Sequence, residues 1–214
     1  MQTETKPDIF EIMVLTPEEA TKMLWEELEK DNPDLELIKD ILAYSPVDVK
    51  VRDYWDLTAL IVAAKDGKEK CVELLLNHPE IDVNLQDESG RTALMYAAYW
   101  GKEKSIELLL KHPGIDVNMQ TKGGWTALMR AAYRGYEKCV ELLLNHPGID
   151  VNVKGKDGWT ALMRAADMGN EKAVELLLNH PRIDVNVQDS EGKTAWDFAT
   201  DSIRHKFPKL FPNS

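Results

Sequence analysis

Four histidines recur at one fixed interval and are the first candidates for metal binding or acid–base catalysis. The differences 112−78, 146−112 and 180−146 all equal 34, so one repeat position holds His78, His112, His146 and His180. Neighbouring repeats lie about 10 Å apart by helix packing, whereas zinc needs several ligands at about 2 Å from one centre. We therefore expect no metal site, and we expect each imidazole to cap backbone carbonyls at a helix end.

Acidic and amide side chains recur with the same interval. An aspartate is followed two residues later by an asparagine in the pairs Asp82 and Asn84, Asp116 and Asn118, Asp150 and Asn152, and Asp184 and Asn186. Such side chains commonly bond backbone groups of a turn, so both rows are expected to be structural. The sequence has no nucleophile–base pair, no glycine-rich phosphate loop after a strand and no Cys/His cluster. Catalysis is therefore the least favoured of the functions considered, and no cofactor is expected.

The two cysteines, Cys71 and Cys139, occupy one repeat position two repeats apart. Two steps of helix packing would separate them by roughly 20 Å, which is beyond the Cα separation of about 7 Å that a disulfide can bridge. The equivalent positions hold the small residues Ser105 and Ala173. Buried free thiols are expected, which suits a reducing compartment and predicts a cytoplasmic protein.

These residues belong to a repeated unit whose helical start is marked by a threonine, at Thr58, Thr92, Thr126, Thr160 and Thr194. The interval predicts full units over 53–86, 87–120, 121–154 and 155–188. A further Asp-Val pair at Asp48 indicates a divergent N-terminal capping unit over 16–52, after an extension of residues 1–15. Residues 189–214 begin as another copy and then lose the pattern, as expected of a C-terminal cap.

Each full unit is predicted to form two short helices that become stable by stacking on their neighbours. In the unit 121–154, Thr126 caps a first helix that Gly135 ends. A second helix begins near Tyr136 and ends at Asn145-His146-Pro147, because a residue before proline avoids helical dihedral angles. Residues 149–152 then form an extended connection.

The two ends of the chain are predicted to cover the array. Residues 1–15 are expected to lie extended over the first unit. Thr16, Pro17 and Glu19 form a capping-box pattern that starts a helix running to about Lys30, and a second helix follows Asp31-Asn32-Pro33. At the other end, an apolar set is expected to fold over the last unit: Trp196, Phe198, Ile203, Phe207, Leu210 and Phe211.

The repeated motifs resemble those of the ankyrin-repeat family over about residues 16–200. The family's G-x-T-P-L-H-x-A-A step is similar to Gly90-Arg91-Thr92-Ala93-Leu94-Met95-Tyr96-Ala97-Ala98, and its G-A-D-V-N turn to Gly114-Ile115-Asp116-Val117-Asn118. Between them, Gly101 with Glu103, Ile106, Leu109 and Leu110 matches G-x-x-E-x-V-x-x-L-L. Alanine and methionine replace the family's proline and histidine, and each unit has one residue more than the usual repeat. The resemblance implies an all-α solenoid of stacked helix-turn-helix units joined by extended turns, and it leaves open hydroxylation of the asparagines in the D-V-N turns.

The resemblance also implies where a partner would bind. In the family, the loop tips and the adjoining end of the first helix line the concave surface that faces the partner. Carried over by register, these places hold Tyr54, Trp55, Leu57, Arg91, Tyr96, Tyr99, Trp100, Trp125, Arg130, Tyr133, Arg134, Trp159, Arg164 and Met168, with Glu88, Lys122, Lys156 and Asp167 among them. Trp, Tyr and Arg dominate interface energies. A partner-binding row is therefore expected, and the alternative is that some of these residues, above all Trp125 and Trp159, pack on neighbouring turns as scaffold.

Composition narrows the class of partner. The chain carries 37 acidic against 26 basic residues and a net charge of −11, which argues against the phosphate attraction that nucleic-acid-binding proteins use. The N-terminus lacks a secretory signal, and no apolar run is long enough to span a bilayer. The sequence predicts a monomeric scaffold that binds a partner protein or peptide. The main alternative is a consensus-like or engineered array without an evolved partner, because repeats this alike arise from recent duplication or from design.

Overall fold

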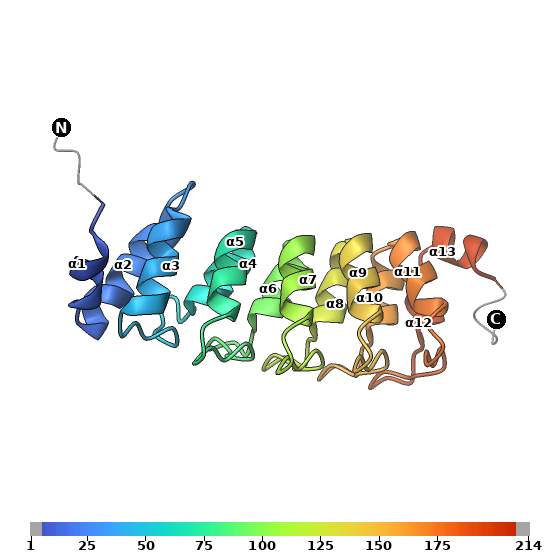
Figure 1. Cartoon of the computed structure of the whole chain (residues 1–214). Helices are drawn as coiled ribbons and strands as arrows, with labels where there is room; N and C mark the ends of the chain where they lie inside the picture. The colour runs from blue at the N-terminus through green and yellow to red at the C-terminus, as the bar shows by residue number, and fades with distance from the viewer. Residues whose placement is uncertain (1–5, 209–214) are drawn as a thin grey trace.

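The computed structural model describes residues 6–208 as a stack of short helices (Figure 1). Within this range there is no strand, and the one isolated β-bridge joins Arg52 to Thr58. The all-α prediction is confirmed. The helices are α1 (Ile9–Met13), α2 (Pro17–Glu29), α3 (Leu35–Tyr44), α4 (Ala59–Asp66), α5 (Glu69–Leu76), α6 (Ala93–Tyr99), α7 (Glu103–Leu110), α8 (Ala127–Arg134), α9 (Glu137–Leu144), α10 (Ala161–Asp167), α11 (Glu171–Leu178), α12 (Ala195–Phe198) and α13 (Asp201–Lys206).

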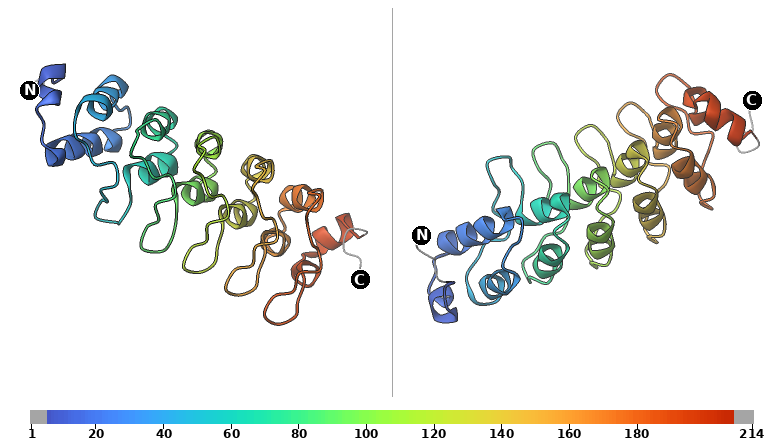
Figure 2. Two further views of the ribbon diagram at one scale, coloured as in Figure 1. Left: turned by 60° about the horizontal axis from the view of Figure 1, so that its bottom comes forward. Right: turned by 90° about the horizontal axis from the view of Figure 1, so that it is seen from above.

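The helices form two layers along an elongated array. The first helix of each pair packs on the first helix of the next pair, from α4 through α6, α8 and α10 to α12. The second helices α3, α5, α7, α9 and α11 pack on one another in the other layer. The loops that precede the first helices project from one edge in a row (Figure 2). We call the surface formed by these loops and the first helices the concave face.

Caps at both ends fix the length of each first helix. Thr126 Oγ1 accepts a hydrogen bond from Met129 N, and the other full units repeat this cap. Gly135 ends α8 in the left-handed conformation, with φ at 71°, which glycine adopts without a steric penalty. The predicted start and stop signals are therefore confirmed.

Small residues bring the first helices together. Ala131 and Ala132 of α8 have no exposed surface, and the alanine pairs of the neighbouring first helices are equally buried. Without a large side chain between them, these helices approach closely, while Val140 and Leu143 of α9 fill the space between the layers. One helix pair has too little apolar surface to fold alone, so stacking supplies the core.

The asparagines and aspartates of the turns join one unit to the next. Asn84 Nδ2 donates to Gly114 O (2.7 Å), and Asn84 Oδ1 accepts from Asp116 N (2.9 Å). Asn118 and Asn152 repeat this pair of bonds. The expected structural role is confirmed, with the addition that the asparagine bonds the following unit's turn. Each aspartate side chain accepts the backbone N–H of the asparagine, as predicted.

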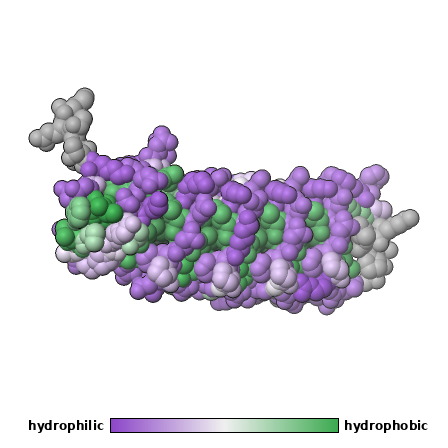
Figure 3. Space-filling view, viewed as in Figure 1, coloured by the Kyte–Doolittle hydropathy of each residue, from purple (hydrophilic) through white to green (hydrophobic). Residues whose placement is uncertain are grey.

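The prediction of an extended N-terminal segment is wrong. Residues 9–13 form α1, because Asp8 caps Phe10 N and Glu11 N while the Glu11 side chain accepts from Asp8 N. This capping box offsets the cost of starting a very short helix. Ile12 is fully buried against the rest of the fold, whereas Phe10 and Met13 are 75% and 55% exposed. An apolar area is visible over the N-terminal end in Figure 3, which views the side of the second helices.

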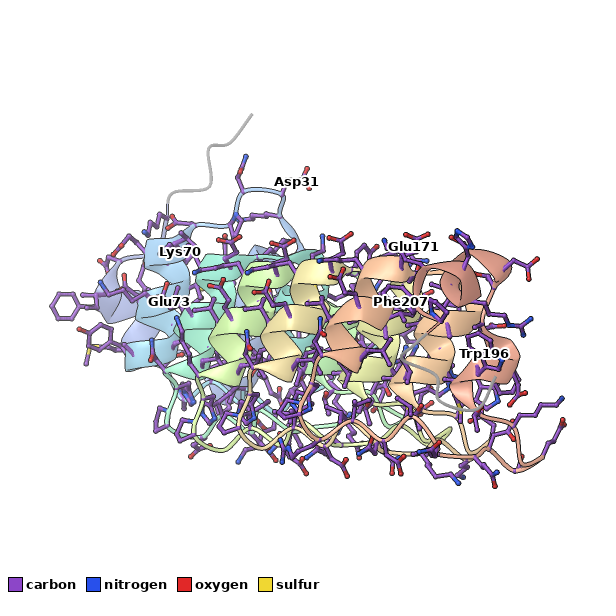
Figure 4. All side chains as sticks on the ribbon, turned by 90° about the vertical axis from the view of Figure 1, so that its right-hand side faces the viewer. Asp31, Lys70, Glu73, Glu171, Trp196 and Phe207 are labelled. Carbon is purple, nitrogen blue, oxygen red and sulfur yellow. The ribbon has the colours of Figure 1, made fainter. Side chains whose placement is uncertain are left out.

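The C-terminal cap has the predicted position. Ile203 is fully buried and Phe207 is 6% exposed, while Trp196 and Phe198 are partly buried against the same core. Two predicted members of this set, Leu210 and Phe211, lie outside the described residues. Glu171 of α11 forms an ion pair with Lys206 of α13 (2.7 Å), and Figure 4 shows Glu171, Trp196 and Phe207 together at this end of the array.

Both cysteines are free and buried, as predicted. Burial raises the pKa of the Cys139 thiol to about 12 and also raises the pKa of Cys71. Because the thiolate is the reactive form, we expect neither thiol of the native chain to react with an aromatic disulfide reagent at pH 7 within minutes. Both should react once the chain is unfolded in guanidinium, and fast labelling of the native chain would contradict the burial of these residues.

Candidate interaction surface

The histidine row lies at the ends of the second helices and takes part in backbone hydrogen bonding. His146 Nδ1 accepts from Gly148 N (3.2 Å), and the other three histidines make the same contact with the residue two positions later. The prediction that these side chains cap carbonyls is therefore wrong, because the ring nitrogen accepts a hydrogen bond from a backbone N–H of the turn that follows the helix. Among residues 6–208, no group of three or more His, Cys, Asp or Glu side chains could hold a metal ion.

Replacing His146 with asparagine tests this role. We expect the free energy of unfolding to change by no more than about 1 kcal/mol, the contribution of one partly exposed hydrogen bond. The measurement is urea unfolding followed by circular dichroism, with calorimetric titration of zinc into the parent and the variant. Stoichiometric zinc uptake by the parent that the variant loses would show that the row binds metal.

The predicted partner-binding residues lie on the concave face, with one exception. Leu57 is 7% exposed and belongs to the core, so it offers a partner almost no surface. Its place beside the loop is occupied by a polar residue or a tryptophan in the later units, and the register alone did not reveal that the leucine turns inward. The exposed apolar and aromatic members of the row are Tyr54 (94%), Trp55 (72%), Trp100 (47%) and Met168 (45%), and Arg134 is exposed as well.

The middle of the row is a stack of alternating cations and aromatic rings. Arg164 lies between Trp125 and Trp159, with its guanidinium carbon 4.1 Å and 4.4 Å from the ring centres. One unit earlier, Arg130 lies 5.7 Å from Tyr99 and 6.0 Å from Trp125. The stack therefore ties consecutive units together through cation–π contacts, each of about 0.5–1 kcal/mol where exposed.

Trp125 and Trp159 are half-buried within this stack. Trp125 meets the Tyr133 ring edge-on, with centroids 5.6 Å apart, and Trp159 lies 4.1 Å from the Phe198 ring of the next helix pair. Trp125 therefore packs within its own unit and Trp159 packs against the next one, and each keeps part of its surface exposed. These contacts favour a scaffold role for the two residues over a role in binding a partner.

Arg91 and Tyr96 are turned toward a buried carboxylate that the sequence interpretation did not include. Asp87 is 6% exposed and accepts from Arg91 Nε (2.7 Å) and from the Tyr96 hydroxyl (2.8 Å). Burial acts to raise the pKa of Asp87, but the hydrogen bonds from the Arg91 backbone N–H, the Tyr96 hydroxyl and the Arg91 side chain outweigh it, and the pKa lies below its ordinary value. Burial, together with the bond to Asp87, raises the pKa of Tyr96 to about 12. The Asp87-x-x-x-Arg91 spacing was the available signal for this pair.

The four arginines of the row therefore differ in charge balance. Arg91 is paired with Asp87, and Arg164 with Asp157, whose carboxylate accepts from the Arg164 guanidinium. Among the described residues, neither Arg130 nor Arg134 has a carboxylate within ion-pair distance.

The two uncompensated arginines flank Tyr99. Arg134 lies 5.0 Å from the Tyr99 ring and donates to the Tyr136 hydroxyl (3.3 Å). Arg130 Nε is buried without a hydrogen-bond partner. Burial, followed by the nearby charge of Arg91, lowers the pKa of Arg130 below its ordinary value. A guanidinium remains protonated under such shifts, so the centre of the face carries two positive charges without a carboxylate partner, one on the exposed Arg134 and one on the partly buried Arg130.

The comparisons with known proteins agree with this architecture. No helix of the described residues has both the length and the apolar character needed to cross a membrane. A search of curated proteins finds no match. The crystal structure of EF0377, an ankyrin repeat protein, is similar to this chain with a TM-score of 0.79 and 26% sequence identity, covering 90% of this chain and 98% of that one. The family model for ankyrin repeats (3 copies) matches residues 28–121 and 113–189, so the chain belongs to the ankyrin-repeat family.

Proposed function

We propose that the concave face binds a partner protein or peptide, centred on Tyr99, Trp100, Tyr133 and Arg134. Ankyrin repeats are generally protein-interaction modules, and the finer assignment rests on charge. The observation that carries it is the pair of arginines without carboxylate partners, Arg130 and Arg134, on a chain whose net charge is −11.

The chemistry of this centre favours an acidic group on the partner. A guanidinium binds a carboxylate through two parallel hydrogen bonds, and a ring behind it fixes its plane. Tyr99 supplies such a ring to both arginines. Asp87 and Asp157 already neutralise Arg91 and Arg164, so the positive charge that this face offers to a partner comes from Arg130 and Arg134.

The residues around the arginines can add apolar contact. Trp100 is 47% exposed and meets Tyr99 edge-on, with centroids 5.3 Å apart. In the next unit, Asp167 and Met168 occupy the positions of Tyr133 and Arg134 within an otherwise similar helix. The fold therefore tolerates different side chains here, which supports a role in binding rather than in folding.

The test is to identify a partner and to measure its affinity for matched variants. Trp100→Ala or Tyr133→Ala should weaken binding by about 2 kcal/mol or more, the range of interface hot spots. Arg134→Gln should weaken binding and also reduce its dependence on salt, because a charge pair is screened by ions. Lys104→Ala, on the second helix α7 away from this face, is the control and should bind as the parent does.

Calorimetry gives the affinity, and circular dichroism gives the folded fraction of each variant. If Trp100→Ala unfolds the chain but leaves the affinity per folded molecule unchanged, the residue belongs to the core. A scaffold without an evolved partner would then be the better interpretation.

A further inference from the structure

A hollow lies at the N-terminal end of the concave face, beyond the arginine pair. It has a volume of about 730 Å³ and lies between the N-terminal cap, the loop of residues 53–57 and the first helix α6. Five aromatic residues line it: Trp25, Tyr54, Trp55, Tyr96 and Trp100. Tyr54 and Trp55 contact each other edge-on at 5.9 Å and are the most exposed aromatic residues of the row.

The hollow exists because one loop departs from the repeat. In the later units a glycine at the loop tip lets successive loops touch; a Cβ on Gly90 would lie 2.8 Å from Lys122 N. The equivalent residue of the first loop, 34 positions earlier, is Asp56, with φ at 62°. Its Cβ is incompatible with such close stacking.

The backbone contacts show the same departure. Lys122 N donates to Ser89 O (2.9 Å) between the second and third loops. Among the described residues, no equivalent bond joins Glu88 N to Trp55 O. The tips of the first and second loops are therefore not bonded to each other, although Arg52 Nη1 donates to Gln86 O (2.6 Å) at the start of these loops. The space between the tips opens onto the aromatic rings. A non-glycine residue held at positive φ costs free energy that the local fold must offset, and such residues often mark functional sites.

The rim of the hollow is acidic. Five lining residues are acidic, namely Glu29, Asp53, Asp56, Asp66 and Glu88, against the two basic residues Lys65 and Arg91. Both basic residues already face a carboxylate, Lys65 that of Asp66 and Arg91 that of Asp87. Among the described residues, Glu29, Asp53 and Glu88 have no cationic partner within ion-pair distance. The hollow therefore combines a negatively charged rim with aromatic ring faces.

We propose that this hollow binds an arginine or lysine side chain of a basic segment of the partner polypeptide. The negative face of an aromatic ring attracts a cation, and the carboxylates that lack a cationic partner attract it as well. The proposal rests on the proposed function, since it adds a second contact on the same face. A partner would then present a basic group to this hollow and an acidic group to Arg130 and Arg134.

The six tryptophans make the site testable without a known partner. Trp25, Trp55 and Trp100 line the hollow, whereas Trp125 and Trp159 lie in the stack and Trp196 in the C-terminal cap. Their indole N–H signals can be followed by NMR in the full 15N-labelled chain and assigned with single Trp→Phe variants. The probes are the peptide acetyl-Gly-Arg-Gly-Arg-Gly-amide and its counterpart with glutamate in place of arginine.

We expect the arginine peptide to shift the signals of Trp25, Trp55 and Trp100 and to leave those of Trp159 and Trp196 in place. The glutamate peptide should not shift the first three. Trp55→Ala and Glu88→Gln should each weaken binding of the arginine peptide by about two- to fivefold, the effect of one exposed cation–π or charge contact. Both residues are exposed, so neither change removes core packing.

Arg130→Gln separates this proposal from the proposed function. The Arg130→Gln variant should bind the arginine peptide as tightly as the parent does, but it should bind the partner protein more weakly. Equal shifts with both peptides, shifts centred on Trp159 or Trp196, or an unchanged affinity in Trp55→Ala would overturn the cation site. If the cation site is overturned in this way, but Trp100→Ala and Arg130→Gln still weaken binding of the partner, the proposed function is retained.

Discussion

Replacing Gly124 with alanine is expected to lower the free energy of unfolding by about 2–4 kcal/mol. Gly124 has φ at 82°, which costs an L-residue roughly 1–2 kcal/mol. In addition, a Cβ at this position would lie 2.5 Å from Lys156 N and 2.8 Å from Gly155 Cα, both backbone atoms of the next loop. The two loops would have to separate, which would break the bond from Lys156 N to Gly123 O (3.4 Å).

Gly192→Ala is the matched control for that change. Gly192 has φ at 80° at the equivalent position of the last loop, but a Cβ there would meet no atom within 4 Å. Its replacement should therefore cost only the dihedral penalty of roughly 1–2 kcal/mol. Urea unfolding followed by circular dichroism measures both. Equal losses in the two variants would show that contact between loops contributes nothing, and would weaken the account of the hollow around Asp56.

The helical part of the fold could be predicted because its signals are local and repeated. Thr126 and Gly135 mark the two ends of one helix by cap chemistry that needs no distant contact. The 34-residue interval then places the same helix in each unit. The helix α1 was missed, although Asp8 and Glu11 form the capping-box pattern. The apolar residues of this segment lack helical spacing, and the burial of Ile12 that stabilises the helix is a tertiary contact.

The sequence predicts where the candidate site lies, but it does not predict which of its charged side chains are already paired. Register placed Arg130, Arg134 and Trp100 on one face, since residues one repeat apart share an environment. Register does not show which charges are already neutralised. The pair Asp87 and Arg91 depends on a loop that turns the carboxylate inward, and the stack around Arg164 depends on how far apart neighbouring units lie. Both are properties of packing, so they appear only in the folded chain.

The hollow shows the same limit in another form. Asp56 stands in the sequence where the later units have glycine, and this difference was readable. Its consequence was not, because the effect of one Cβ depends on how closely the next loop approaches. At Gly90 and Gly124 the next loop lies so close that a Cβ would clash with its backbone. An aspartate at the equivalent position, Asp56, therefore prevents the first two loops from stacking in the same way.

The second large effect is expected at the C-terminal cap, where Ile203→Ala should lower the free energy of unfolding by about 2–5 kcal/mol. Ile203 is fully buried on α13, which packs against α11. Truncating a buried aliphatic side chain removes its transfer free energy and leaves a cavity. The other contacts of α13 are polar and partly exposed: Lys206 pairs with Glu171 (2.7 Å), Ser202 also bonds Glu171, and Arg204 donates to Trp196 O (3.2 Å).

His205→Ala, two residues away on the exposed side of α13, is the control and should change the free energy of unfolding by no more than about 0.5 kcal/mol. The comparison uses urea unfolding, with size-exclusion chromatography to follow self-association. A chain ended at Thr200 should show the Ile203→Ala effect in stronger form, because a solenoid that loses its cap exposes the apolar side of its last helix pair. If Ile203→Ala or the shortened chain remains as stable and as monodisperse as the parent, α13 does not cap the array, and the last helix pair must be stable with that side open to solvent.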